Sequence, residues 1–320
     1  MKRRLAIRLI GIPGVASFLS LALLGAVISA HAGAGGDDFT IRNVVRLVLL
    51  DVSVQNHDGN FVPGLSKQDF TVLENGSPQT ISVFDNEDAP VTMGILIDES
   101  GSMTPKRSQV LAAAEDLIAD SNPADEVFVL NFNDFVKRGL PPGTPFSSKI
   151  PQLRAALNRE RPTGKTALYD AVADGLKQLE DGTRGRKTLI LVSDGRDNAS
   201  LHTRAQTFDL VERSAATIFT IGLFDADQYD ADPATLRQLA KISGGEAMFP
   251  MQLSEVSGAC HRVAKEIRTR YTIGYVPKED KKERNASSLR HIQVKVSAPG
   301  QSGVAVLSRT SYRYDELETK

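Results

Sequence analysis

The sequence VTMGILIDESGSM occupies residues 91–103 and indicates the fold class of the chain. Its first half is an apolar run rich in branched residues, which is typical of a buried strand. The run ends abruptly at Asp98, and Ser100, Gly101 and Ser102 follow it. In open α/β sheets ligands bind at the edge where the strands end, so we expect these polar side chains at that edge.

Asp98, Ser100 and Ser102 alternate along the chain, so a loop that continues the strand can direct three oxygen atoms toward one point. A carboxylate with two hydroxyls is an oxygen-only ligand set, which suits Mg²⁺ far better than zinc or copper. The same residue types are also ordinary turn formers before a helix. Taken alone, the stretch leaves both interpretations open.

Two later segments favour the metal-binding interpretation. Residues 187–195 read KTLILVSDG, a second apolar strand that ends in Asp194 and Gly195. Between the two strands, residues 163–170 read TGKTALYD, a glycine turn that leads into a helix and contains Thr166. Three polar segments therefore follow one another in an order that could converge on a single site.

Together the three segments resemble a von Willebrand factor type A (VWA) domain, over about residues 90–270. In that family a metal-ion-dependent adhesion site combines Asp-x-Ser-x-Ser with a threonine from a second loop and an aspartate from a third. The resemblance implies Mg²⁺, or Mn²⁺ or Ca²⁺, with one position open for a carboxylate of a protein partner. The flanking segments resemble those of secreted bacterial VWA-related proteins. The residues that match the family's site are Asp98, Ser100, Ser102, Thr166 and Asp194.

The alternation of strand and helix patterns between residues 90 and 270 predicts an α/β fold. We expect a doubly wound, mostly parallel, Rossmann-like sheet with helices on both faces. In the last helix Cys260 falls at apolar spacing, which favours a core residue over a reactive thiol. The expected strands are 91–97, 125–132, 188–193 and 217–223, and the expected helices are 107–120, 149–158, 167–179, 203–215, 233–242 and 252–268.

Residues 33–89 and 271–320 have short strand and turn patterns instead. Each segment is too small to hold a stable core alone, so we expect the two to pack together as a β-sandwich into which the VWA domain is inserted. A polar tail is expected after the last strand. The expected strands lie within 43–54, 70–74, 81–84, 271–277, 290–297 and 304–307.

The first 32 residues have the pattern of a secretory signal peptide: a basic start, an apolar stretch from Leu9 to Ile28, and Ala30-His31-Ala32. An uncleaved membrane anchor is the competing interpretation, because the apolar stretch is nearly long enough to span a bilayer. Pro13 and the small residues at the end favour cleavage. Both interpretations place the rest of the chain outside the cytoplasm, in the periplasm or secreted.

The charge of the chain argues against nucleic acid as a partner. The formal net charge is −1. Removal of residues 1–32 changes it to −5, because that segment holds four basic residues and no acidic one. Nucleic-acid binding would require a basic surface, which this balance does not predict. Cys260 is the single cysteine, so no intrachain disulfide is possible.

Enzyme classes find little support in the sequence, and we predict no catalytic residues. A P-loop ending in Lys165 and Thr166 would need glycine where Arg159 stands, and a Gly-x-Ser-x-Gly motif around Ser100 would need glycines at positions 98 and 102. A metal-dependent hydrolase stays open as a less favoured alternative, because a bound metal ion can activate water, but the sequence shows no identifiable base for it. We therefore predict a non-enzymatic protein-binding module; a structural envelope protein with a purely stabilising metal site stays open as the alternative.

One acidic segment, residues 225–232, follows a predicted strand at the same sheet edge. It could bind Ca²⁺ or influence the choice of partner. The favoured interpretation is a solvated turn in which Asp232 caps the next helix and Pro233 takes its first position.

Overall fold

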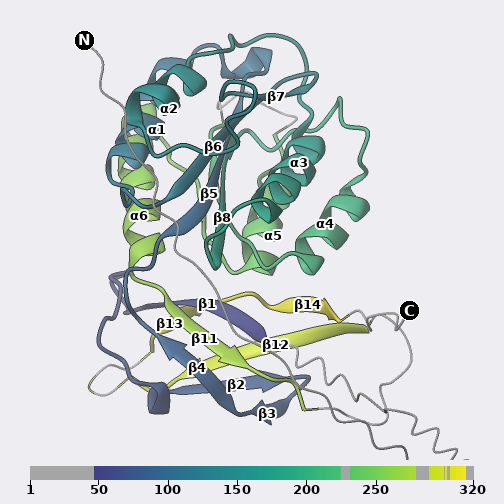
Figure 1. Ribbon diagram of the computed structural model, residues 1–320. Helices are drawn as coiled ribbons and strands as arrows, with labels where there is room; N and C mark the ends of the chain where they lie inside the picture. The colour runs from purple at the N-terminus through teal and green to yellow at the C-terminus, as the bar shows by residue number, and fades with distance from the viewer. Residues whose placement is uncertain (1–46, 225–230, 279–287, 299, 301–302, 315–320) are drawn as a thin grey trace, which may run out of the picture. The chain divides into compact units, whose positions relative to one another are not determined.

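The computed structural model describes residues 47–224, 231–278, 288–298, 300 and 303–314 (Figure 1). All of these residues belong to one compact unit of the chain. The expected signal peptide and most of the acidic segment, residues 225–230, lie outside the described residues. Within the described ranges, no helix is long and apolar enough to cross a membrane.

A six-stranded sheet forms the centre of the α/β region, in the strand order β10-β9-β8-β5-β6-β7. The strands β9, β8, β5 and β6 run parallel, β10 is parallel to β9, and the edge strand β7 is antiparallel to β6. The predicted mostly parallel sheet is therefore confirmed. The strands are β5 (Val91–Asp98), β6 (Glu126–Phe132), β7 (Val136–Arg138), β8 (Arg186–Ser193), β9 (Thr217–Gly222) and β10 (Ala247–Met248).

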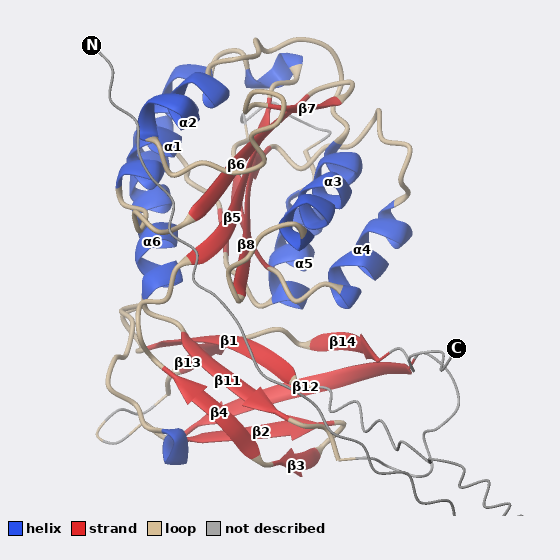
Figure 2. Cartoon of the chain, in the orientation of Figure 1, coloured by secondary structure: helices blue, strands red, loops and turns tan. Residues whose placement is uncertain are grey.

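Helices cover both faces of this sheet, as expected for a doubly wound fold. Figure 2 shows α1, α2 and α6 on one face and α3, α4 and α5 on the other. A single-turn helix η2 (Gly101–Met103) precedes α1, and η3 (Leu253–Glu255) precedes α6. The helices are α1 (Arg107–Ala119), α2 (Ile150–Leu157), α3 (Leu168–Glu180), α4 (Arg204–Arg213), α5 (Pro233–Ser243) and α6 (Val256–Arg268).

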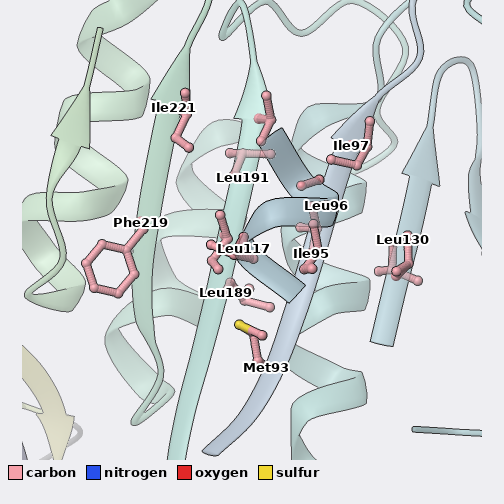
Figure 3. Close-up of a cluster of buried hydrophobic side chains, with 14 of the residues drawn as sticks. Met93, Ile95, Leu96, Ile97, Leu117, Leu130, Leu189, Leu191, Phe219 and Ile221 are labelled. Carbon is pink, nitrogen blue, oxygen red and sulfur yellow. The ribbon is translucent and has the colours of Figure 1, made fainter. Parts of the chain in front are cut away.

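The central strand β5 is buried along its whole length. Its apolar side chains join those of β8, β9 and α1 in one core cluster (Figure 3). Gly94 interrupts the apolar run because the ring of Phe128 fills that space: a Cβ atom at position 94 would lie 2.3 Å from Phe128 Cζ. Tight packing on both faces fixes the direction of β5 and hence the position of Asp98 at its end.

Two further four-stranded sheets form the predicted β-sandwich, and each combines strands from both ends of the chain. Side chains from the two sheets enclose a second apolar core, which includes Val52, Val72 and Ile273. A single-turn helix, η1 (Lys67–Asp69), leads into β2. One sheet has the order β13 (Ala305–Leu307), β1 (Val48–Gln55), β11 (Tyr271–Tyr275), β4 (Ile81–Asp85), and the other β14 (Ser311–Tyr314), β12 (Ser288–Val296), β2 (Phe70–Glu74), β3 (Ser77–Gln79).

The expectation of a polar tail after residue 307 was wrong, because β14 pairs with β12 in the second sheet. The pattern of β14 looks polar, yet its Tyr312 is buried and donates its hydroxyl hydrogen to Glu74 at 2.9 Å. Glu74 also accepts a hydrogen bond from Tyr275 at 2.7 Å and lies 3.3 Å from Arg290. A buried polar network therefore holds a strand that apolar patterning alone does not reveal.

Arginine side chains join the sandwich to the VWA region. Arg186 Nε lies 3.3 Å from Asp51 Oδ1 in β1. Arg262 of α6 donates to Gln55 Oε1 at 3.0 Å, and Arg309 donates to the carbonyl oxygen of Glu212 at 3.1 Å. These contacts, made by side chains with long apolar stems, connect β1 and the segment between β13 and β14 to the VWA region.

Candidate metal centre

Asp98 is the last residue of β5, and its side chain is buried. Its Oδ2 accepts a hydrogen bond from Ser193 Oγ at 2.6 Å, and its Oδ1 accepts one from the Ser100 backbone N–H at 2.9 Å. Burial raises the pKa of Asp98 to about 6; the hydrogen bonds from Ser193 and Ser100 act against this rise, and the charge of Asp194 adds to it. The carboxylate is thus held in place where a negative charge is costly.

Asp194 follows directly after β8 and is fully buried. Its Oδ2 accepts a hydrogen bond from Ser102 Oγ at 2.7 Å, and its Oδ1 accepts one from the Arg196 backbone N–H at 3.1 Å. The hydroxyls of Ser100 and Ser102 lie 3.1 Å apart. Asp98, Ser100, Ser102 and Asp194 consequently form one continuous chain of hydrogen bonds.

Thr166 joins this group through the backbone of its loop. The loop touches the first one where Gly101 N–H donates to the Gly164 carbonyl at 3.2 Å. It touches the third where Thr166 N–H donates to Asn198 Oδ1 at 2.8 Å and the Thr166 carbonyl accepts from Asn198 N–H at 2.9 Å. The three loops that the sequence singled out therefore meet at one edge of the sheet.

The site reaches the protein surface at two side chains. Ser102 is half-buried, and 26% of the Arg196 side chain is exposed. Arg196 Nη2 lies 3.6 Å from Asp194 Oδ2. Ser102 and Arg196 are therefore two partly exposed side chains in contact with the buried carboxylate of Asp194.

Sequence reasoning missed the role of Ser193 and did not assign Asn198; for Arg196 it gave only the expectation that this residue and Asp197, which follow Asp194, border the binding surface. All three lie at or just beyond the end of β8, so their place next to Asp194 was the available signal. Glu99, between Asp98 and Ser100, points elsewhere: its Oε2 lies 3.1 Å from Arg107 Nε. Burial raises the pKa of Glu99 to about 7, and the hydrogen bond and charge of Arg107 oppose the rise.

The donor set fits a hard divalent cation. Asp98 and Asp194 bring two buried negative charges together, and the hydroxyls around them are neutral oxygen donors. A cation would compensate charges that are otherwise expensive to bury. Among the described residues, no three His, Cys, Asp or Glu side chains gather in a group that could hold a metal ion.

Two other sequence expectations concern neighbouring positions. Asp232 caps α5, because its Oδ1 accepts from Thr235 N–H at 2.9 Å, as the capping interpretation predicted. Its own N–H donates to the Asp194 carbonyl at 3.2 Å. Cys260 is buried in the core, and burial raises the pKa of its thiol to about 12, which agrees with an unreactive role.

With this geometry established, comparison with known proteins decides the family. The sequence model of the von Willebrand factor type A domain family matches residues 93–266, more than half of the chain. The chain belongs to the von Willebrand factor type A family. The matched range includes all five predicted site residues of the VWA domain.

Solved structures show the same fold at low sequence identity. A von Willebrand factor type A protein from Catenulispora acidiphila is 13% identical, with a TM-score of 0.50, and the match covers 85% of this chain and 74% of that one. Proximal thread matrix protein 1 from the mussel byssus is 15% identical, with a TM-score of 0.50, and the match covers 61% of this chain and 51% of that one. The chain thus spans about half the length of the mussel protein. A comparison with curated proteins finds no match.

Proposed function

We propose that this chain is an exported, non-enzymatic protein whose VWA domain binds a protein partner through a divalent cation. VWA domains are generally interaction modules rather than enzymes. The observation that supports the metal site most directly is the hydrogen bond from Ser102 to Asp194, which joins the first and third loops at 2.7 Å. The signal-peptide pattern of residues 1–32 supports the export.

In this proposal Asp98 and Asp194 supply the charge that attracts Mg²⁺, or Mn²⁺ or Ca²⁺, directly or through water. Ser100, Ser102 and Thr166 supply neutral hydroxyl oxygens. When bound, the ion supplies an electrophilic position that accepts a carboxylate oxygen from an acidic side chain of the partner. Because most ligands are neutral, much of the positive charge of the ion stays available to that carboxylate.

The residues around the ligands keep them in place without the ion. Ser193 orients the carboxylate of Asp98, and the backbone N–H of Arg196 orients that of Asp194. Such preorganisation reduces the loss of conformational freedom on binding, so it raises affinity.

We also propose the boundaries 33–89 and 271–320 for the sandwich segments and 90–270 for the VWA domain.

Calorimetric titration of Mg²⁺ and Mn²⁺ into the chain lacking residues 1–32 tests the metal site. Asp194→Asn should abolish binding, because it removes one of the two charges. Asp116→Asn serves as the matched control, since it changes a carboxylate of α1 that bonds Ser257 instead. Unchanged affinity in a folded Asp194→Asn variant would contradict the proposal.

A capture experiment then separates the proposed function from its alternatives. The immobilised protein should retain a partner in Mn²⁺ and release it in EDTA, and the Asp194→Asn variant should retain none. Metal binding without any metal-dependent capture would instead support a structural protein whose ion only stabilises the fold. Divalent-dependent turnover of a substrate, lost in Asp98→Ala, would support a hydrolase.

A further inference from the structure

A positively charged side chain already lies beside the proposed metal ligands. The guanidinium of Arg196 approaches Asp194 Oδ2 to 3.6 Å, at the same oxygen that accepts the hydrogen bond from Ser102. Asp194 has no exposed surface, whereas about a quarter of the Arg196 side chain is exposed. The guanidinium therefore lies between the buried carboxylate and the solvent.

Two hydrogen bonds that hold Asp194 in its loop do not use the side chain of Arg196. Its backbone N–H holds Asp194 Oδ1 at 3.1 Å, and the Asp194 carbonyl accepts from Asp232 N–H at 3.2 Å. Neither bond uses the guanidinium of Arg196. A substitution that removes the guanidinium keeps them, so it changes the charge next to Asp194 more than the position of that carboxylate.

Electrostatics gives this charge a definite effect. A carboxylate that is paired with a guanidinium loses part of that attraction when a dication binds to it, and the two positive charges repel each other at short range. Partial exposure of Arg196 screens the repulsion without removing it. The ion must therefore bind against the arginine or displace it toward the solvent.

We propose that Arg196 is an internal counter-cation of the metal site, which compensates Asp194 when no ion is bound and competes with the ion for that carboxylate. The inference rests on the proposed function. Arg196 makes the affinity for the ion weaker than the ligands alone would give. When the ion displaces its guanidinium, that positive charge lies at the surface where an acidic partner would bind. Arg196 is then a positioning residue that couples ion binding to the partner's carboxylate.

Titration of Mn²⁺ into wild type, Arg196→Gln and Arg196→Lys tests the inference. The Gln variant should bind Mn²⁺ about tenfold more tightly, and the Lys variant should bind within about twofold of wild type, because it keeps the charge. Arg107→Gln is the matched control: Arg107 has nearly the same exposure and also pairs with a buried carboxylate, but that carboxylate is Glu99. This control should change the affinity by less than about twofold.

Thermal unfolding gives a second readout that a merely structural role would not move. In EDTA, Arg196→Gln should melt below wild type, because Asp194 loses its compensating charge. In saturating Mn²⁺ the difference should shrink or reverse, because the ion replaces the guanidinium. An equal loss in both conditions would mean a structural role and would overturn the inference.

The outcomes for the two proposals are distinguishable. Equal Mn²⁺ affinity in wild type and Arg196→Gln, or weaker binding by the variant, overturns the counter-cation inference and leaves the metal site standing. A lack of ion binding in both proteins overturns the proposed function, and the inference falls with it.

Discussion

The hydroxyl of Ser102 donates a hydrogen bond to Asp194 at 2.7 Å, although the two residues are 92 positions apart in the chain. Ser102 lies in the single turn η2 shortly after β5, and Asp194 in the loop after β8. These strands are neighbours in the parallel sheet, so their carboxyl ends meet at one edge. The pairing of β5 with β8 is thus what brings the two loops together.

Ser102→Ala should weaken Mn²⁺ binding by about tenfold to a hundredfold, because it removes an oxygen donor and the bond that orients Asp194. The free energy of unfolding in EDTA should fall by no more than about 1 kcal/mol, since Ser102 is half-buried. Calorimetry and urea unfolding measure the two effects. Ser108→Ala, on the exposed surface of α1, is the control and should leave both unchanged; equal affinities for the two variants would remove Ser102 from the ligand set.

Gly94→Ala should destabilise the VWA domain by about 1–3 kcal/mol, because its methyl group would overlap the ring of Phe128. Urea unfolding measures the loss. Phe128→Leu should recover part of it in the double variant, since a smaller side chain frees the space. Additive effects of the two substitutions would show that the clash with Phe128 is not the cause.

Glu126→Gln should make stability less dependent on pH. Burial alone would raise the pKa of Glu126, but hydrogen bonds from Thr183 and Thr92 outweigh it and lower the pKa to about 2. Because the folded pKa lies below the ordinary value, the carboxylate stabilises the fold above about pH 4.5, and this contribution disappears as the pH falls toward 2. The variant should therefore be less stable than wild type by up to about 3 kcal/mol at pH 7, and the gap should narrow at pH 3.

Urea unfolding at the two pH values measures that gap. Glu115→Gln is the control, because Glu115 pairs with Arg154 at the surface at 2.7 Å and should contribute less than about 1 kcal/mol. A gap for Glu126→Gln that stays constant or widens between pH 7 and pH 3 would contradict the stabilising role of its charge.

Glu74→Ala should destabilise the β-sandwich by about 3–5 kcal/mol, because it leaves Arg290 as a buried charge without its carboxylate. Tyr312→Phe should cost only about 1 kcal/mol, since Glu74 keeps its bond from Tyr275. Chemical denaturation followed by tyrosine fluorescence measures both losses. The exposed Glu87→Ala is the control, and similar effects of the two glutamate substitutions would contradict a structural role of the network.

Much of the fold could be predicted because apolar periodicity and burial coincide in the VWA domain. The run ending at Asp98 is apolar on both faces, and the observed β5 is buried on both. Strand β14 escaped prediction because its stability comes from a long-range bond between Tyr312 and Glu74 rather than from a local pattern. The two-residue strand β10 is too short for any periodicity to reveal.

The candidate site, like the fold, could be predicted only in part. The three loops follow from motif and strand order, so Asp98, Thr166 and Asp194 could be placed at one sheet edge in advance. The hydrogen bond from Ser193 to Asp98 and the approach of the Arg196 guanidinium to Asp194 could not be predicted. The direction of a side chain in a loop depends on the packing around it. Whether these residues hold an ion stays a prediction that the titrations above decide.

The pairing of β1 with β11 and of β2 with β12 has a consequence for how the chain acquires its structure. β1 and β2 are synthesised early, and their edges stay unpaired until the complete VWA domain and then β11 and β12 have been synthesised. Unpaired strand edges can pair with other chains, so the protein is most prone to aggregation during this interval. Fragments truncated before Tyr271 should therefore aggregate or attract chaperones, even where their VWA domain has already folded.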